Sequence, residues 1–403
     1  MWHRSDNSDM EISTNADLLF STTMPSVAQF DGIATGALGR GIDALMAKDY
    51  DTAVREFKRS IALSPYSDNA SKAFEYMANA LVSNGKTSEA IATYRQAIEV
   101  FPSADGFNLS LGNLYYGEGR YTEALDQYAS AVRKNPTANQ NVYSLGQGYL
   151  ALGRYGEAEE QFKKIIQSTP KDSGGYFALG QTYRMEGKYD DAQEQLDKAL
   201  ALKKDFASVH FELGMTYAEQ QQIDQAKAEL AIVLEDAPQS YLELQNKIYE
   251  KSAPRVIAAY IANLKLASPP GTQVSDLNSA LATPGAHKKY TIQFVFDKNM
   301  DPAAVRNIAN WSINRSTGAT TGGPYNWGTP IPATEISLSR IPDSVIYDPE
   351  RLTAQVTFTI AQNSTGNGTI DLSHLVFKFG GTDAHGNAMD AAADEYNVIS
   401  QIA

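Results

Sequence analysis

The chain of 403 residues contains no cysteine. This absence excludes disulfide bonds, thiolate catalysis, iron–sulfur clusters and cysteine-ligated zinc, and it leaves the redox compartment open. Long apolar runs are missing as well. The longest, Val256 to Ala262, ends at Asn263 and is far shorter than the roughly 18 residues that a membrane-spanning helix needs. The N-terminal stretch also lacks the hydrophobic segment of a signal peptide, so the protein is either cytoplasmic or a processed secreted chain.

Basic residues are comparatively few. The chain has 34 Lys and Arg residues and 47 Asp and Glu residues, which gives a net charge of −13. Nucleic acids and anionic membrane surfaces attract basic patches, so neither is expected as the main partner. The five histidines are scattered and form no His-Glu-x-x-His pair. With no catalytic constellation, we expect a protein that is not an enzyme and that uses no cofactor.

A pattern of small residues, aromatic residues and prolines recurs every 34 residues from about residue 34 to residue 238. Six units follow this pattern, and the two N-terminal ones are looser. A fixed period of this length is typical of helical repeat proteins. In the clearest unit the recurring residues are Leu145, Gly146, Tyr149, Gly153, Tyr155, Ala158, Phe162 and Pro170.

These units resemble the tetratricopeptide repeat, a pair of antiparallel helices. The resemblance implies an α solenoid of six helix pairs, with Gly146 and its equivalents allowing the second helix of a pair to approach the first. Residues 239–267 are expected to cap the stack with two helices separated by Pro254, and residues 268–285 to form a linker. The N-terminal arm, residues 1–33, is polar and cannot form a core alone.

The concave groove of the solenoid is the best candidate site for a protein partner. Its lining follows from the repeat register, in which one first-helix position carries an amide in four units. An amide both donates and accepts hydrogen bonds, so a row of amides can pair with an extended peptide backbone. Packing against the next repeat is the competing interpretation. The groove residues are Asn79, Asn113, Gln147 and Gln181, with Leu109, Tyr143, Phe177 and Phe211 four residues before the amide position, and Tyr116 and Arg184 three residues after it.

The pattern changes at about residue 286. Short segments with alternating apolar residues lie at 290–296, 334–339, 354–360 and 375–379, separated by turn residues. Residues 286–403 are therefore predicted to form an all-β sandwich. The segments 294–305, 307–313 and 380–390 resemble bacterial Ig-like domains of S-layer and other secreted surface proteins. This resemblance implies an extracellular or cell-envelope location in a prokaryote.

Four aspartates of the predicted sandwich, Asp297, Asp301, Asp383 and Asp390, are weak candidates for a calcium site. Calcium favours several carboxylate ligands. Aspartate is also an ordinary turn residue, and the spacing fits no established calcium loop. We therefore expect no metal as the simpler outcome.

Three functions remain open. The first is a non-catalytic scaffold of the cell envelope or extracellular space that binds a protein partner in the groove. The second is a self-assembling subunit of a filament or surface layer. In that case Leu18, Leu19 and Phe20 of the arm would add a strand to a sheet edge or enter the groove of the next molecule. The third is a cytoplasmic adaptor, and the arm could also fold back on its own chain.

Overall fold

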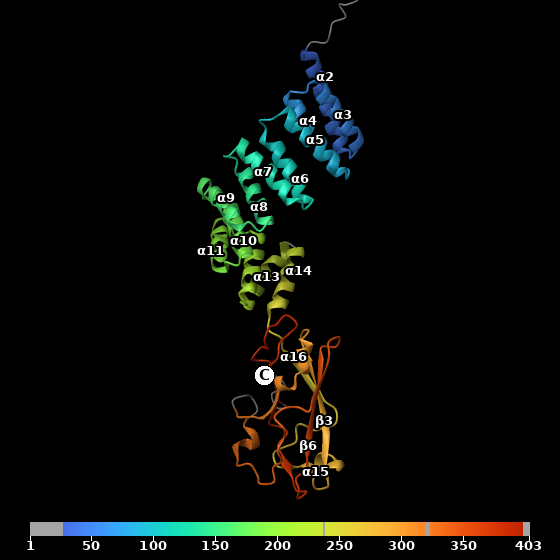
Figure 1. Ribbon diagram of the computed structural model, residues 1–403, viewed down its shortest axis with the longest axis vertical. Coiled ribbons are helices and arrows are strands. Elements are labelled where there is room, and N and C mark those ends of the chain that lie inside the picture. The colour runs from blue at the N-terminus through green and yellow to red at the C-terminus, as the bar shows by residue number, and fades with distance from the viewer. Residues whose placement is uncertain (1–26, 237, 319–322, 398–403) are drawn as a thin grey trace, which may run out of the picture. The chain divides into compact units, whose positions relative to one another are not determined.

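The computed structural model describes residues 27–236, 238–318 and 323–397 (Figure 1). Two compact units divide the chain, one up to Glu212 and one from Leu213 onward. The self-association residues Leu18, Leu19 and Phe20 lie outside the described residues. Within the described part, no helix is long and apolar enough to cross a membrane.

The first unit consists of paired helices whose lengths match the 34-residue period. Its first helix begins at Val27 rather than at the expected residue 34, and Ala34, Ala37 and Leu38 are buried within it. The helices are α2 (Val27–Met46), α3 (Tyr50–Leu63), α4 (Asp68–Ser83), α5 (Thr87–Val100), α6 (Asp105–Gly117), α7 (Tyr121–Lys134), α8 (Asn139–Ala151), α9 (Tyr155–Ser168), α10 (Ser173–Glu186) and α11 (Tyr189–Leu202).

In each helix pair, a small residue on the first helix allows the second helix to approach closely. A Cβ atom on Gly146 of α8 would lie 2.5 Å from Cε1 of Phe162 on α9, so only glycine permits this approach. The turns within the pairs also fit the prediction. Gly119, Gly153 and Gly187 have positive φ angles of 74°, 68° and 86°, the left-handed conformation that glycine adopts without strain.

The helical repeats continue with α12 (Ala207–Glu219), which contains the division between the units, α13 (Ile223–Asp236) and α14 (Pro238–Lys251). A second capping helix was expected after Pro254, and this expectation is wrong. Residues 256–261 instead form strand β1 (Val256–Ile261), which pairs antiparallel with β3. Three of its six residues are β-branched, and pairing with a neighbouring strand satisfies its backbone groups better than a short isolated helix would.

The rest of the second unit is built from two antiparallel sheets that share one hydrophobic core. Sheet one has the order β1-β3-β6-β5 and sheet two the order β4-β8-β9, while β2 and β7 form a separate short pair. Phe294 and Phe358 from sheet one pack against Phe377 from sheet two, with ring centroids 6.3 and 5.4 Å apart. The strands after β1 are β2 (Thr272–Gln273), β3 (His287–Phe296), β4 (Trp311–Arg315), β5 (Ser344–Asp348), β6 (Thr353–Ala361), β7 (Thr369–Ile370), β8 (Leu375–Phe379) and β9 (Glu395–Asn397).

Two further segments differ from the sequence-based expectation. Residues 268–285, expected as a linker, carry β2 together with α15 (Val274–Leu277) and η1 (Ser279–Leu281), and they bury Val274 and Leu281 completely. The strand expected at 334–339 is absent, because this segment forms only an isolated bridge from Glu335 to Thr369. The α solenoid followed by an all-β region is nevertheless the architecture that the sequence predicts.

Candidate functional site

The amide row predicted for the groove comes from four successive first helices. Asn79 of α4 and Asn113 of α6 are exposed, whereas Gln147 of α8 and Gln181 of α10 are half-buried. The spacing of 34 residues places each amide at the same position of its helix, directly after the small residue that closes the pair. Equivalent helices therefore present equivalent side chains, which is how a repeat protein builds an extended binding surface.

The two exposed asparagines are held by tyrosines of their partner helices. The hydroxyl of Tyr128 on α7 donates to Oδ1 of Asn113 at 2.9 Å, and Tyr94 on α5 donates to Oδ1 of Asn79 at 3.4 Å. Burial raises the pKa of both tyrosines, so each hydroxyl remains protonated and able to donate at neutral pH. The bond occupies the amide oxygen. Among the described residues the Nδ2 group of each asparagine has no acceptor, so the donor is available to a ligand.

At the other end of the amide row, Gln147 and Gln181 contact side chains of the protein itself. Gln181 Nε2 donates to Oε1 of Glu212 at 2.7 Å, and Nε of Arg184 donates to Oε2 of the same carboxylate. Glu212 is almost completely buried, so this carboxylate requires both donors. Gln147 is half-buried and lies close to the hydroxyl of Tyr143. The geometry thus separates an open half of the row, at Asn79 and Asn113, from a half that stabilises the repeat.

The predicted aromatic lining also packs between helices. Tyr143 lies against Phe162 with ring centroids 5.7 Å apart, and Phe177 lies against Phe206 at 5.0 Å. Tyr116 packs on Tyr121 at 5.1 Å. The remaining apolar groove positions are Leu109, which is buried, and Phe211, which is partly exposed.

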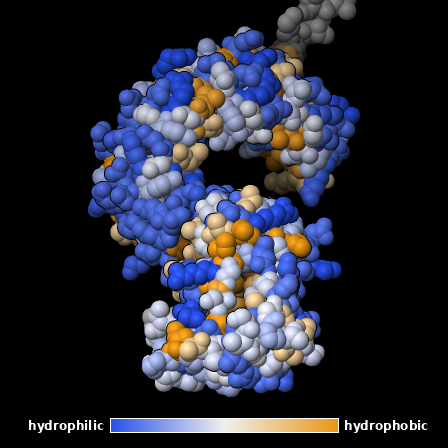
Figure 2. All heavy atoms as spheres, turned by 60° about the horizontal axis from the view of Figure 1, so that its bottom comes forward, coloured by the Kyte–Doolittle hydropathy of each residue, from blue (hydrophilic) through white to orange (hydrophobic). Residues whose placement is uncertain are grey.

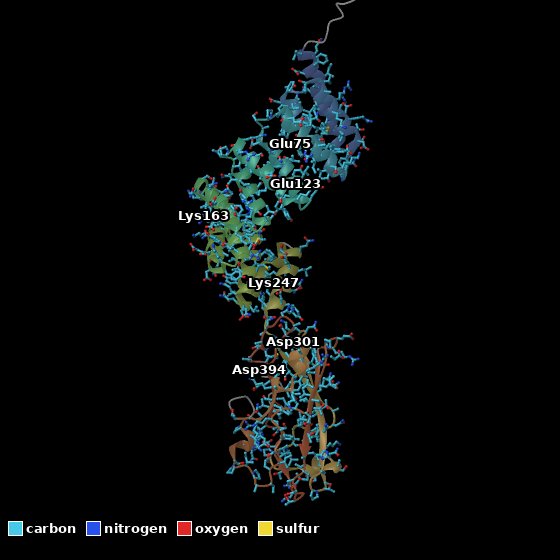
Figure 3. All side chains as sticks on the ribbon, in the orientation of Figure 1. Glu75, Glu123, Lys163, Lys247, Asp301 and Asp394 are labelled. Carbon is cyan, nitrogen blue, oxygen red and sulfur yellow. The ribbon has the colours of Figure 1, made fainter. Side chains whose placement is uncertain are left out.

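One residue of this surface was missed by the sequence prediction. Glu75 lies four residues before Asn79, at the register position that carries Leu109 in the next repeat, and its side chain is exposed (Figure 3). The repeat register was the signal that could have identified it. Its charge raises the pKa of Tyr94 further, which indicates that the carboxylate lies close to the open half of the row. The helical repeats otherwise expose mostly hydrophilic side chains, with small separate apolar patches (Figure 2).

The four calcium candidates have individual protein partners. Asp383 binds the ammonium group of Lys298 at 2.7 Å, and Asp390 forms an ion pair with Arg255 at 3.3 Å. Asp297 accepts from the backbone N–H of Arg255, and Asp301 caps the short helix α16 (Pro302–Arg306). Among the described residues, no group of three or more histidines and carboxylates is arranged to hold a metal ion.

The helical part of the chain matches a known family. Residues 77–139, 111–173, 143–205 and 183–248 match the Tetratricopeptide repeat family. The predicted repeats are therefore confirmed for residues 77–248, and repeats of this family indicate a protein–protein interaction scaffold. No curated protein matches the chain.

Several solved structures are similar to part of the chain. A tetratricopeptide repeat protein from Parabacteroides merdae ATCC 43184 is 19% identical over 54% of this chain and 86% of its own, with a TM-score of 0.49. PilF from Pseudomonas aeruginosa is 17% identical over 54% of this chain and 99% of its own, with a TM-score of 0.43. A thermophilic protein from Thermus thermophilus is 22% identical over 45% of this chain and 98% of its own, with a TM-score of 0.38.

Proposed function

We propose that this chain is a non-catalytic scaffold. It binds an extended segment of a protein partner along the surface formed by the first helix of each repeat. The observation that carries the proposal is the pair of tyrosine-held asparagines, Asn79 and Asn113. Each presents an Nδ2 donor. The 2.9 Å bond from Tyr128 orients the Asn113 amide before binding, whereas the 3.4 Å contact from Tyr94 orients the Asn79 amide more loosely, and oriented donors lose less entropy when a ligand arrives. Donors repeated at one register position suit the repeating carbonyl groups of an extended backbone.

The charge of this surface restricts the kind of partner segment that it can bind. Arg184 is the only basic residue among the predicted groove positions, and it is paired with Glu212. Glu75 adds an exposed carboxylate beside the open asparagines. A carboxylate-rich tail would meet repulsion here, since recognition of such tails depends on cations. The proposed partner is therefore a neutral or basic segment.

We also propose that the protein works outside the cell or in the cell envelope of a prokaryote. The support is the resemblance of residues 286–403 to Ig-like domains of secreted surface proteins. A cytoplasmic adaptor would use the same groove, so location needs its own test. Antibody labelling of intact cells, compared with permeabilised cells, distinguishes the two. Labelling only after permeabilisation would contradict the envelope assignment.

The groove proposal is tested with a random dodecapeptide library displayed on phage. The full chain should enrich neutral or basic peptides, and a photocrosslinker placed at residue 116 should attach to them. Peptides that crosslink from residue 116 and compete with one another define a single site. If no peptide is enriched, or if none crosslinks from this position, the proposed groove is not the binding surface.

A further inference from the structure

The open half of the amide row repeats one kind of unused hydrogen-bonding group. The Tyr94 hydroxyl donates to Oδ1 of Asn79. The Tyr128 hydroxyl donates to Oδ1 of Asn113, and neither Nδ2 group has an acceptor among the described residues. A surface whose unused groups are donors is matched by a ligand that is rich in carbonyl oxygens and poor in N–H groups. Proline has this property, because it keeps its backbone carbonyl and lacks the N–H.

The spacing of the two donors distinguishes between extended conformations. Asn79 and Asn113 occupy the same position of neighbouring first helices, and the Tyr94 hydroxyl that binds Asn79 also lies close to Ser110 of α6. Helices that are neighbours in a stack lie about 8–10 Å apart. Carbonyls on one side of a polyproline II helix recur every three residues, or about 9 Å. On a β-strand they recur every two residues, or about 7 Å, so the polyproline II spacing fits the row better.

Tyrosines from three successive helices gather beside Asn113. Burial, and to a smaller extent the nearby hydroxyl of Tyr116 on α6, raises the pKa of Tyr128 on α7 and of Tyr143 on α8. Tyr116 and Tyr143 remain partly exposed. Grooves lined by aromatic side chains bind polyproline II segments well, because the ligand is already extended and loses little entropy on binding.

One carboxylate lies beside the first asparagine. Glu75 is exposed, precedes Asn79 by four residues on α4 and has no ion-pair partner among the described residues, Lys72 included (Figure 3). After burial, the charge of Glu75 contributes to the raised pKa of Tyr94, so the carboxylate lies near the hydroxyl that binds Asn79. A lysine or arginine of a ligand therefore finds an acid here that the protein itself leaves unpaired.

We propose that the open half of the row binds a proline-rich segment in the polyproline II conformation, with a lysine or arginine that pairs with Glu75. Two carbonyls three residues apart accept from Asn79 and Asn113, and a proline ring packs on Tyr116. The inference rests on the proposed groove and names the chemistry of its ligand.

The test is calorimetry of the full chain with three synthetic peptides. The first is Pro-Pro-Lys-Pro-Pro-Leu-Pro-Pro, and the second carries glutamate in place of its lysine. The third, Thr-Val-Lys-Val-Thr-Leu-Val-Thr, keeps the lysine but favours a β-strand. The first should bind at least tenfold more tightly than the third. It should bind at least threefold more tightly than the second, a modest factor because exposed ion pairs contribute little.

Two variants of the protein test the charge pairing. Glu75→Lys should reverse the preference for lysine over glutamate and leave the preference for proline unchanged. Glu99→Lys is the matched control, because it makes the same charge change on an exposed residue of α5, and it should keep both preferences. Circular dichroism of both variants confirms that the fold is intact. If the two variants change the preference for lysine equally, Glu75 is not the partner of the cation.

The outcomes separate this inference from the proposed groove. If library peptides crosslink from residue 116 but show no enrichment of proline, the polyproline II assignment is wrong and the groove stands. The same holds if the β-branched peptide binds as tightly as the proline-rich peptide. If no peptide crosslinks from residue 116, the groove itself is wrong, and the inference fails with it.

Discussion

The ammonium group of Lys298 lies 2.7 Å from Oδ2 of Asp383, and both side chains are at least 98% buried. The same ammonium donates to the carbonyl oxygen of Ser252, just after helix α14, at 2.6 Å. Asn387 donates to the carbonyl of Glu250 at 2.6 Å and to Asp383 at 2.8 Å. These bonds attach the C-terminal end of α14 to two turns of the β domain. A lysine thus neutralises the carboxylate for which the sequence suggested calcium.

Removing one partner of this pair should destabilise the second unit strongly. In Lys298→Met the Asp383 carboxylate keeps the donors of Asn387 but loses its counter-charge in a buried position. The expected loss is about 3–5 kcal/mol, the range for breaking a buried ion pair. Chemical denaturation followed by tryptophan fluorescence measures it. Lys289→Met, on an exposed lysine of β3, is the control and should change stability by less than about 0.5 kcal/mol. Equal behaviour of the two variants would contradict the structural role of Lys298.

The ion pair of Lys298 and Asp383 also predicts that the stability of the fold depends on pH. Burial raises the pKa of Asp383, but hydrogen bonds from Lys298 and Asn387 lower it more, so the net pKa lies below its usual value. Because the folded pKa is below the unfolded value of about 3.9, the contribution to stability is present above that value and is lost as pH falls through the folded pKa. The difference in thermal midpoint between the native chain and Asp383→Asn should therefore be constant near neutral pH and shrink below about pH 4. A difference that grows on acidification would refute this assignment.

Two glycine substitutions should have opposite effects. In Gly146→Ala the new methyl group collides with Phe162, so overpacking should cost about 1–3 kcal/mol. Gly106 of α6 has no atom within 4 Å of the corresponding position, so Gly106→Ala should be neutral or stabilise the chain by up to about 1 kcal/mol. Thermal melts of both variants provide the comparison. An unchanged melt for Gly146→Ala would show that the assigned helix contact is wrong.

The turn between α12 and α13 contains a strained residue. Gln221 occupies the register position of Gly187 in the preceding repeat and adopts a φ of 60°. A side chain in the left-handed region costs about 1–2 kcal/mol, so Gln221→Gly should raise the thermal midpoint. In Gln225→Gly, inside helix α13, the same substitution should lower stability by about 1 kcal/mol. If both variants lose stability equally, the positive φ of Gln221 carries no strain.

The sequence predicted the helical repeats well because their determinants are local and periodic. Gly146 and Phe162 lie 16 residues apart, and the repetition of this pair in neighbouring units reveals which helices pack. The open and closed halves of the amide row were less predictable. Gln181 is closed because Glu212, on the first helix of the following repeat, replaces the apolar or small residue found there in other units. In the sequence, Gln181 can be distinguished from Asn113 only by comparing, repeat by repeat, the residues that stand at the positions around each amide.

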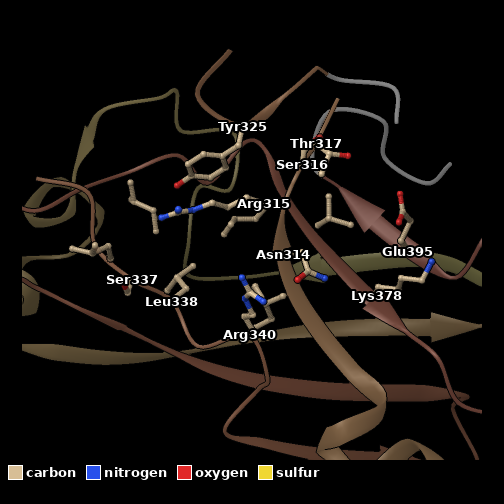
Figure 4. A pocket seen from close by; sticks show the side chains of 15 residues that line it. Asn314, Arg315, Ser316, Thr317, Tyr325, Ser337, Leu338, Arg340, Lys378 and Glu395 are labelled. Atoms are coloured by element: carbon tan, nitrogen blue, oxygen red, sulfur yellow. The ribbon is translucent and has the colours of Figure 1, made fainter. Parts of the chain in front are cut away.

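The β domain was less predictable because its contacts are distant in the sequence. Strand β1 follows a proline after a run of helices, so its Val256 and Ile257 were assigned to a helix, and pairing with β3 decides otherwise. Lys298 and Asp383 are 85 residues apart, and the sequence around each residue does not indicate their contact. Arg315, Arg340 and Lys378 line one cavity (Figure 4) but come from three separate segments, so their proximity appears only in the folded chain.

The most direct test of the groove is the affinity of a selected neutral peptide for the double variant Asn79→Asp with Asn113→Asp. This change keeps the oxygen that accepts from Tyr94 and Tyr128, replaces each Nδ2 donor with a carboxylate oxygen, and adds one negative charge at each position. Each lost hydrogen bond should cost about 0.5–1.5 kcal/mol, so the Kd measured by calorimetry should rise about 5- to 150-fold. Gln96→Glu with Gln167→Glu, on exposed second-helix positions, adds the same charge and should leave the Kd unchanged. Equal Kd values for the native chain and both double variants would contradict the account.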